Sequence, residues 1–549
     1  MKQENRILIF MILFASLFGG FYEFSAMFMA VMLVTGLIIA YKRNGYLKIP
    51  KTMEFAGVLI IAVMYLLTIF YGVDSGTSVS GAIKIVPAIL FFMYWNNISN
   101  REKSIIWTQI PVTGTILTVV AIALYPFETT RELLFRAERL GGTFQYSNTY
   151  ALFLLIGIIV LLYTEQWQWK EKIEIIVLTA GIIFTGSRGV AVLSVVIIGI
   201  HLIWKRNGKR FLLIGAAVLA AVIASVLVLG LDIGRLSKLT LDSSTLNGRF
   251  LYWQDAIPLL WKHPFGLGYM GYYFLQSQIQ TGNYVTKFVH NDFLQTGLDA
   301  GIIPLLIIIG IVLKTLVSKK TNGRETIVLL ILSIHSLFDF DLQFVCMVMI
   351  GIMCLEDAGE KTVRKMNKMM IPALAVTGIF SIYFVTAFGL AYMEKYDVAL
   401  KLYPYNTFAR EERMQKEVSV SDARWLTDKN GQLPDAYEVL IQNQCEKGTM
   451  DGITADVEQM LDHAGYQAEY YDQAVYYLSI ALDNAVRSGD RKESQKILNT
   501  IQQIPDKIEE KCNQSSKLAY KIHDKPEIKL DTSIQNYLDK ISNVTLEQD

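Results

Sequence analysis

Charged residues and cysteines are scarce in this chain, and each scarcity excludes a class of protein. Only 18% of the 549 residues are charged and 52% are hydrophobic, whereas about 25% of residues are charged in an average soluble domain. The formal net charge of +1 gives no overall positive field that would attract nucleic acid, so no nucleic-acid partner is expected. The four cysteines are too few for a disulfide scaffold, and they do not form a Cys/His metal-binding pattern. Cys346 and Cys354 lie in an apolar stretch, whereas Cys445 and Cys512 could pair only in oxidising surroundings.

Apolar segments long enough to cross a bilayer recur along the first 392 residues. A membrane-spanning helix needs about 20 predominantly apolar residues, and about thirteen segments of roughly 15–22 residues meet that pattern. They are expected near residues 6–21, 25–41, 54–72, 79–95, 105–125, 148–163, 171–185, 189–204, 211–231, 300–317, 326–338, 341–355 and 370–392. The sequence therefore predicts an all-α, polytopic membrane domain over residues 1–392.

Basic residues follow every second span. Lys42 and Arg43 come after the second span, and Arg101 and Lys103 come after the fourth. Because Lys and Arg in short loops tend to stay on the cytoplasmic side, we expect a multi-pass protein of the cell membrane with a cytoplasmic N-terminus.

The same alternation assigns three segments to the outer side of the membrane. Residues 232–299 form a large outer loop, and an odd number of spans leaves residues 394–549 outside. The pattern also requires two spans joined at the turn of residues 186–189, which places Arg188 at the outer surface.

The tail of residues 394–549 has the composition of a helical domain. Apolar and aromatic residues recur at helical spacing in residues 469–477 and 491–504. The pattern resembles tetratricopeptide-type helical pairs without a clean repeat register. We therefore expect an α-helical, TPR-like domain that binds a protein partner rather than performing chemistry.

Four groups that suit chemistry on a diphosphate fall on the predicted outer face, namely Arg139, Arg188, Arg249 and His290. Arg makes forked contacts with phosphate oxygens, and His can take a proton from an attacking hydroxyl near neutral pH. The outer loops contain no convincing Asp-x-Asp pair, which disfavours a metal-held nucleotide sugar. The pattern predicts group transfer from a diphosphate leaving group, with neither a metal nor a cofactor.

Each of these residues also has a structural interpretation. A single Arg at the outer end of a span is commonly an interfacial anchor, and most loop histidines are inert. Asn291 and Asp299 distinguish the surroundings of His290. His335 and Asp339 flank the outer end of the span at 326–338, where they could pair or shape a pocket.

Several ordered motifs carry a family resemblance. They are Gly-Ser-Arg-Gly at 186–189, Gly-Arg-x-x-x-Trp at 248–253, Pro-Phe-Gly-Leu-Gly at 264–268, His-Asn-Asp-Phe-Leu at 290–294, Asp-Ala-Gly at 299–301 and His-Ser-Leu-Phe-Asp at 335–339. Over roughly residues 50–360 the chain resembles the O-antigen ligase and polymerase superfamily. The family more often has Glu, one methylene longer, at the position of Asp299.

The resemblance implies a GT-C-type membrane fold and an inverting, metal-independent glycosyltransferase reaction. A glycan would pass from an undecaprenyl diphosphate carrier to a hydroxyl of another glycan or an envelope polymer. Carried over, Arg188 and Arg249 would hold the diphosphate and His290 would activate or position the acceptor, with Arg139 as a weaker match.

Two other functions compete with this hypothesis. A transporter or flippase of a lipid-linked sugar would need polar groups along a path through the bilayer, yet Lys84, His201 and His335 are nearly the only such groups in the spans. A surface-binding protein would not need so many spans. Within the enzyme hypothesis, ligase and polymerase both stay open.

Overall fold

The computed structural model describes residues 5–204, 214–215, 218, 244–318, 323–355, 363–366, 370–448, 452–522, 524–542 and 544. Of the predicted span at 211–231, it describes only residues 214, 215 and 218. The start of the predicted outer loop, residues 232–243, lies outside the described residues.

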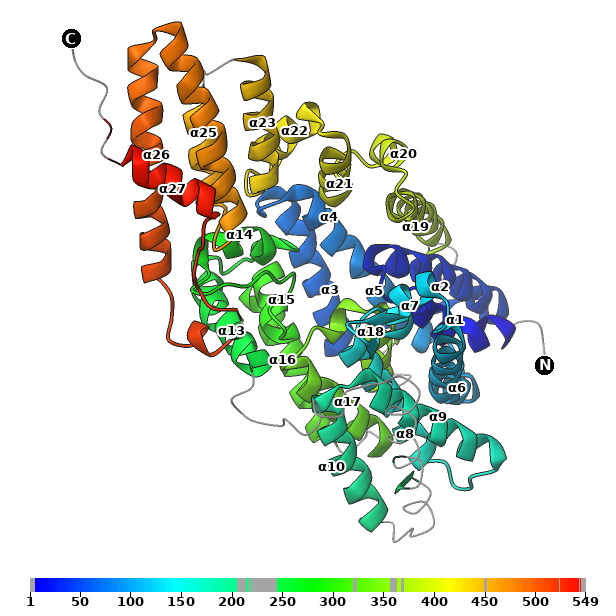
Figure 1. The fold of residues 1–549 in the computed structure, drawn as a ribbon. Coiled ribbons are helices and arrows are strands. Elements are labelled where there is room, and N and C mark those ends of the chain that lie inside the picture. Colours follow the sequence, from blue (N-terminus) through cyan, green and yellow to red (C-terminus); the bar gives the residue numbers. More distant parts are fainter. Residues whose placement is uncertain are drawn as a thin grey trace.

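Helices dominate the described part of the chain, as the sequence predicts (Figure 1). In the membrane domain they are α1 (Asn5–Leu17), α2 (Tyr22–Asn44), α3 (Met53–Leu67), η1 (Thr68–Phe70), α4 (Ser75–Lys84), α5 (Val86–Trp95), α6 (Asn100–Leu124), α7 (Glu128–Leu134), η2 (Gly142–Phe144), α8 (Ser147–Leu162), α9 (Trp169–Thr185), α10 (Arg188–Trp204), α13 (Ser244–Lys262), α14 (Gly271–Ile279), α15 (Asp292–Ala300), α16 (Ile302–Val317), α17 (Gly323–Ser336), η3 (Asp341–Gln343), α18 (Val345–Met353) and α19 (Met370–Tyr392).

Five helical segments among the described residues are long and apolar enough to cross a membrane. They are Tyr22–Asn44, Met53–Phe70, Ser75–Trp95, Asn100–Leu124 and Met370–Tyr392. The other predicted spans in the described residues correspond to shorter helices. The helical membrane class is therefore confirmed, and the number of about thirteen spans stays a prediction.

Local sequence explains where several of these helices begin and break. The side chain of Asp74 accepts a hydrogen bond from the Thr77 amide and caps α4. Ser99 and Glu102 form a capping box at the start of α6. Pro87 lies in the first turn of α5, where its missing amide hydrogen costs no hydrogen bond within the helix. Its ring cannot continue the preceding helix, so it separates α4 from α5.

Two short antiparallel ladders join segments far apart in sequence or close a turn. Strand β1 (Leu47–Pro50) pairs with β4 (Val363–Met366). This pairing brings together the loops after the second and the twelfth predicted spans. Two loops can pair in this way only if they lie on the same side of a membrane. Strand β2 (Phe135–Arg136) pairs with β3 (Arg139–Leu140) in the loop that carries Arg139.

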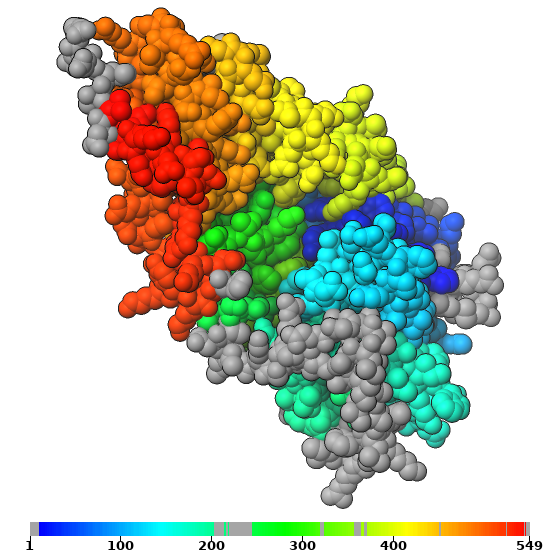
Figure 2. All heavy atoms as spheres, in the orientation of Figure 1, coloured from blue at the N-terminus to red at the C-terminus, as the bar shows by residue number. Residues whose placement is uncertain are grey.

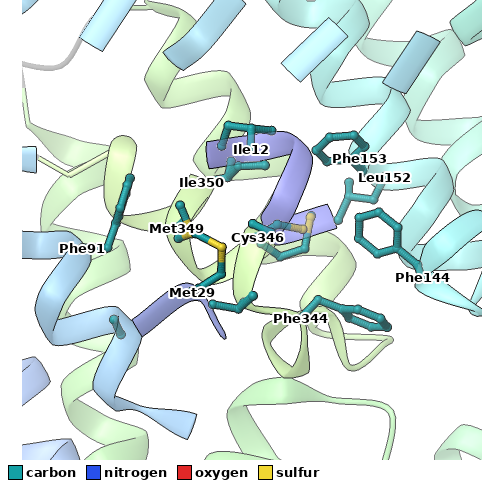
Figure 3. Close-up of a cluster of buried hydrophobic side chains, with 14 of the residues drawn as sticks. Ile12, Met29, Phe91, Phe144, Leu152, Phe153, Phe344, Cys346, Met349 and Ile350 are labelled. Atoms are coloured by element: carbon teal, nitrogen blue, oxygen red, sulfur yellow. The ribbon is translucent and has the colours of Figure 1, made fainter. Parts of the chain in front are cut away.

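The main core lies where α1, α2, α5, α8 and α18 meet. Figure 3 shows Ile12, Met29, Phe91, Phe153 and Met349 from these helices around Cys346, and all six side chains are almost fully buried. In a bilayer, helices are held together by close van der Waals packing rather than by the hydrophobic effect, so this cluster fixes how the helices pack and thereby where their loops lie.

The tail is helical, as predicted. From Tyr437 on it has a second core, whereas earlier buried residues such as Met414 and Leu426 belong to the main core. The helices of the tail are α20 (Tyr396–Leu402), α21 (Thr407–Glu417), α22 (Val420–Lys429), α23 (Pro434–Lys447), α24 (Ile453–Asp462), α25 (Ala468–Ser488), α26 (Arg491–Asn513), η5 (Ala519–Lys521) and α27 (Thr532–Ile541). Successive helices pack as pairs, α23 with α24 and α25 with α26. Cys445 and Cys512 are both free thiols, and the TPR-like assignment stays a prediction.

The tail packs along one side of the membrane domain (Figures 1 and 2). At the start of α4, Asp74 accepts hydrogen bonds from Thr407 Oγ1 at 2.8 and 2.9 Å and from Asn430 Nδ2 at 2.9 Å. Gly76 is required there, because a Cβ atom would lie 1.8 Å from the Tyr405 carbonyl oxygen. The two parts of the chain are therefore fitted closely against each other.

Candidate active site

Asp339 is the centre of a polar cluster between α17 and η3. Its side chain is 1% exposed and its two oxygens contact four side chains. Tyr146 Oη donates to Oδ1 at 2.6 Å, and Asn148 Nδ2 donates to Oδ2 at 2.8 Å. Arg249 Nη2 donates to Oδ2 at 3.0 Å, and His290 Nδ1 lies 3.3 Å from Oδ1.

The charges around Asp339 decide its ionisation. Burial by itself would raise the pKa of the carboxyl. The hydrogen bond from His290 and the positive charge of Arg249 outweigh burial and hold the pKa of Asp339 well below its usual value. Asp339 is therefore a carboxylate at neutral pH.

His290 lies in the loop before α15 with its backbone in a strained conformation. Its φ of +52° is in the left-handed region that non-glycine residues rarely adopt, and such strain is found preferentially at functional sites. The preceding residue fixes the loop, since the Val289 amide donates to Gln295 Oε1 and its carbonyl accepts from Trp253 Nε1. The ring of Phe340 packs edge-on against the imidazole at 5.0 Å.

The contact with Asp339 assigns the two ring nitrogens of His290. A carboxylate accepts hydrogen bonds, so Nδ1 carries the proton and donates. Nε2 is then the nitrogen able to accept a proton. The side chain is 20% exposed, which lets a substrate reach it.

Arg249 comes from the first half of α13 and faces the same carboxylate. Its side chain is 16% exposed. Its Nε is buried and has no hydrogen-bond partner within the described part of the chain. Because a buried unpaired donor costs about 1–3 kcal/mol, this guanidinium is suited to an anion that would complete its hydrogen bonds.

Arg188 is joined to the helix that carries Arg249. It is the first residue of α10, and its Nη2 donates to Thr245 Oγ1 at 3.3 Å. Thr245 and Arg249 are four residues apart on α13 and so lie on one face of it. The two arginines that the sequence assigns to the diphosphate therefore come from neighbouring helix starts.

Arg139 reaches the cluster through Asn148. Its Nε donates to the Thr185 carbonyl at 2.7 Å and its Nη2 donates to Asn148 Oδ1 at 2.7 Å. Asn148 in turn donates to Asp339. The structure thus links Arg139 to the turn before Arg188 and to the central carboxylate.

His335 does not pair with Asp339, one of the two arrangements that the sequence allows. His335 Nδ1 lies 2.6 Å from Asp341 Oδ2, and Asp341 also accepts from Thr149 Oγ1 at 2.7 Å. Both His335 and Asp341 are buried. This second acid–histidine pair links α17 to α8 through the hydrogen bond from Thr149.

Asn291 and Asp299 both form hydrogen bonds with residues of α15. Asn291 Oδ1 accepts from the Leu294 amide and caps the helix. Asp299 accepts from Tyr65 Oη and Gln295 Nε2, and burial raises its pKa to about 7. The acid in contact with His290 is Asp339 rather than Asp299.

Sequence reasoning missed Tyr146, Asn148, Thr245 and Asp341 as members of this site. Tyr146 and Asn148 follow Arg139 by seven and nine residues, so closeness in sequence to a candidate Arg could have indicated them. Nothing in the pattern singles out Thr245, whose partner Arg188 lies far away in the sequence. Asp341 joins His335 to Thr149 only because α17 packs against α8.

The comparison with known families covers this region. The family model described as O-antigen ligase matches residues 174–309, a stretch that runs from α9 to α16 and contains Arg188, Arg249 and His290. No curated protein was found to match the chain. The resemblance predicted from the motifs is confirmed by the family match over residues 174–309, which are similar to an O-antigen ligase domain.

Proposed function

We propose that this protein transfers a glycan from an undecaprenyl diphosphate carrier to an acceptor hydroxyl during synthesis of a cell-envelope polysaccharide. The observation that carries the proposal is the carboxylate of Asp339, shared by a guanidinium and an imidazole. Such an arrangement holds a cation for the leaving group beside a base for the acceptor.

The reaction follows from the roles of these groups. The acceptor hydroxyl gives its proton to His290 Nε2 while its oxygen attacks the anomeric carbon. The bond from that carbon to the diphosphate oxygen breaks, and its electron pair leaves with the diphosphate. Attack opposite the leaving group inverts the anomeric configuration.

The protein's part in lowering the barrier is electrostatic. Arg188 and Arg249 stabilise the charge that develops on the diphosphate, which in many enzymes is the role of a metal ion. Asp339 orients the imidazole and stabilises the imidazolium that forms. The positioned base contributes about 10²–10⁴-fold in rate.

A cavity beside the polar cluster suits the lipid part of the donor. Its volume is about 210 Å³, and α3, α5, α16, α17 and α18 supply a lining that is mostly aliphatic. Asp292 and Ser336 also line it, and both are close in sequence to His290 and Asp339. We expect the first isoprene units of the carrier to occupy this space, because its mostly aliphatic lining allows van der Waals packing against such a chain.

Sidedness follows from the loop charges and remains part of the proposal. The turn before Arg188, the loop of Arg139, the loop of His290 and the turn of Asp339 are all assigned to the outer side by sequence. Reaction on that side would use a donor that has already crossed the membrane, and the tail would then be extracytoplasmic.

A transporter or flippase is the second candidate, because Lys84 lies within an apolar span. Its Nζ donates to Tyr269 Oη at 2.8 Å and to Gln343 Oε1 at 2.7 Å, so this charge is held in place by two partners. The charged groups of the cluster come from loops and helix ends, which favours chemistry at one surface.

One experiment separates the two candidates. Purified protein in proteoliposomes is given a radiolabelled glycan on undecaprenyl diphosphate, with the matching glycan as acceptor. We expect a longer glycan and free undecaprenyl diphosphate in a one-to-one ratio. Movement of intact donor between leaflets without either product would reject the enzyme in favour of the transporter. Acceptance of an unrelated envelope polymer in place of the glycan would identify a ligase rather than a polymerase.

A further inference from the structure

A second cavity lies between the outer loop and the tail, away from Asp339. Its volume is about 240 Å³, and its walls are α14 on one side and α21, α23 and α25 with their loops on the other. It belongs to neither part alone, because each contributes one wall.

The α14 wall of this loop–tail cavity is held in place by the tail. Lys511 Nζ donates to the carbonyls of Ser277 and Gln280 at 2.9 and 3.1 Å, at the end of α14. Gln278 Nε2 lies 2.9 Å from His463 Nδ1 and donates to Gln432 Oε1 at 3.2 Å. The cavity is therefore preformed, which lowers the entropic cost of binding a ligand.

Aromatic rings and planar polar side chains line the loop–tail cavity together. Tyr273, Phe274 and Tyr470 supply the rings, whereas Gln415 and Gln467 supply carboxamides. An aromatic face covers the C–H face of a sugar ring, and carboxamides and carboxyls exchange hydrogen bonds with its hydroxyls. A small number of polar groups among aromatic ones is the usual lining of a specific small-molecule site.

The carboxyl of Glu411 is the polar group best placed to meet a ligand. It lines the cavity and has no hydrogen-bond partner within the described ranges. Its neighbour Asp435 is already engaged, since it accepts from Gln415 Nε2 at 2.6 Å and from Tyr470 Oη. Burial, followed by the charge of Asp435, raises the pKa of Glu411 to about 8.

Among the described residues, acidic side chains but no Lys or Arg line the cavity, and this lining disfavours anionic ligands. Glu411 and Asp435 line it, and Glu438 and Glu469 are close enough to Asp435 and to each other to affect their ionisation. Lys287 stands over the ring of Phe408 at 5.3 Å, and its positive charge acts on Glu411 in the direction opposite to that of Asp435. A phosphate or uronate would find no Lys or Arg in this lining and would meet the carboxylate of Asp435, whereas an uncharged sugar would not be repelled.

We propose that the loop–tail cavity binds one sugar unit of an uncharged saccharide and thereby holds the acceptor glycan against the outer loop. The volume is below the roughly 300–1,000 Å³ of sites for drug-sized ligands, which fits a single ring of a longer chain. The acceptor role rests on the proposed glycan transfer, whereas the binding itself does not.

Direct binding of soluble probes to the full-length protein in detergent tests the site. The probes are cellotetraose and N,N′,N″,N‴-tetraacetylchitotetraose as uncharged saccharides and tetragalacturonate as an anionic one. Saturation-transfer NMR and calorimetry should detect saturable binding of at least one uncharged probe and none of the anion. Glu411→Ala and Gln467→Ala should each weaken that binding at least fivefold. Glu412→Ala, at an exposed neighbour, is the matched control and should leave the binding unchanged.

The outcomes separate this inference from the proposed function. Absence of saturable binding to either uncharged probe, or binding that neither Glu411→Ala nor Gln467→Ala weakens, would overturn the saccharide site. Displacement of a co-purified peptide from the cavity would overturn it in favour of a protein partner. Intact transfer in the proteoliposome assay with no probe binding rejects the site alone, and probe binding without transfer rejects the enzyme alone.

Discussion

Arg249 and His290 contact opposite oxygens of the Asp339 carboxylate, at 3.0 Å from Oδ2 and 3.3 Å from Oδ1. The residues are 41 positions apart and belong to α13 and to the loop before α15, so one side chain fixes the distance between them. In the proposed reaction this distance separates the leaving group from the base.

Replacing Asp339 by Asn should change how stability depends on pH. The pKa of the folded carboxyl is depressed, so its stabilisation is present above the unfolded pKa of about 3.9 and is lost as pH falls through and below that value. Wild type should lose thermal stability more steeply than Asp339→Asn between pH 6 and pH 3. At pH 7 the variant should be about 3 kcal/mol less stable, because Arg249 loses its buried partner. Parallel melting curves across this pH range, measured by tryptophan fluorescence in detergent, would contradict the ionisation assigned to Asp339.

Replacing Arg188 by Ala should weaken donor binding and leave folding intact. Arg188 is partly exposed at the start of α10, and loss of a charge-assisted contact with phosphate costs about 1.5–3 kcal/mol, or roughly ten- to a hundredfold in affinity. Titration with undecaprenyl diphosphate measures the change, and a melting curve measures stability. Arg136→Ala, an exposed Arg of the same outer face, is the control. Equal donor affinity in both variants would remove Arg188 from the diphosphate site.

Chelation of divalent metals should not reduce transfer. Arg188 and Arg249 supply the positive charge that the leaving diphosphate needs. We expect the same initial rate after dialysis against EDTA as in the presence of Mg²⁺ or Mn²⁺. A rate that falls at least tenfold on chelation and returns with one added metal would show that the arginines are insufficient.

Replacing Gly76 by Ala should loosen the tail from the membrane domain. The added Cβ would lie 1.8 Å from the Tyr405 carbonyl, and such overpacking costs about 1–3 kcal/mol. Limited proteolysis should release the tail faster than from wild type. Gly199→Ala is the control, because nothing lies within 4 Å of its added Cβ. Identical digestion of both variants would contradict the close fit at Asp74 and Gly76.

The sequence predicted the helices of this protein better than its contacts. Apolar runs long enough for helices are local information, so the segments around α2, α6 and α19 were found to within a few residues. Arg249, His290 and Asp339 were each named from motifs. Their convergence on one carboxylate was not, because it depends on how distant helices pack.

The acidic partner of His335 likewise could not be predicted from the sequence. His335 and Asp339 are four residues apart, which suggests a pair on one helix face. The chain leaves helix α17 at Ser336, and Asp339 then turns toward His290 while Asp341 takes His335. A helix end three residues before the acid is not visible in the hydrophobic pattern. The loop–tail cavity escaped sequence analysis for a related reason, since its two walls lie more than a hundred residues apart.

Single-turnover transfer by His290→Gln is the most direct test of the account. Glutamine can still hydrogen-bond Asp339 but cannot accept the acceptor's proton. With the donor bound at wild-type affinity, we predict a transfer rate reduced about 10²–10⁴-fold, while His263→Gln, an exposed His of the same outer interval, keeps the wild-type rate. A rate within threefold of wild type for His290→Gln would contradict the assignment of His290 as the base.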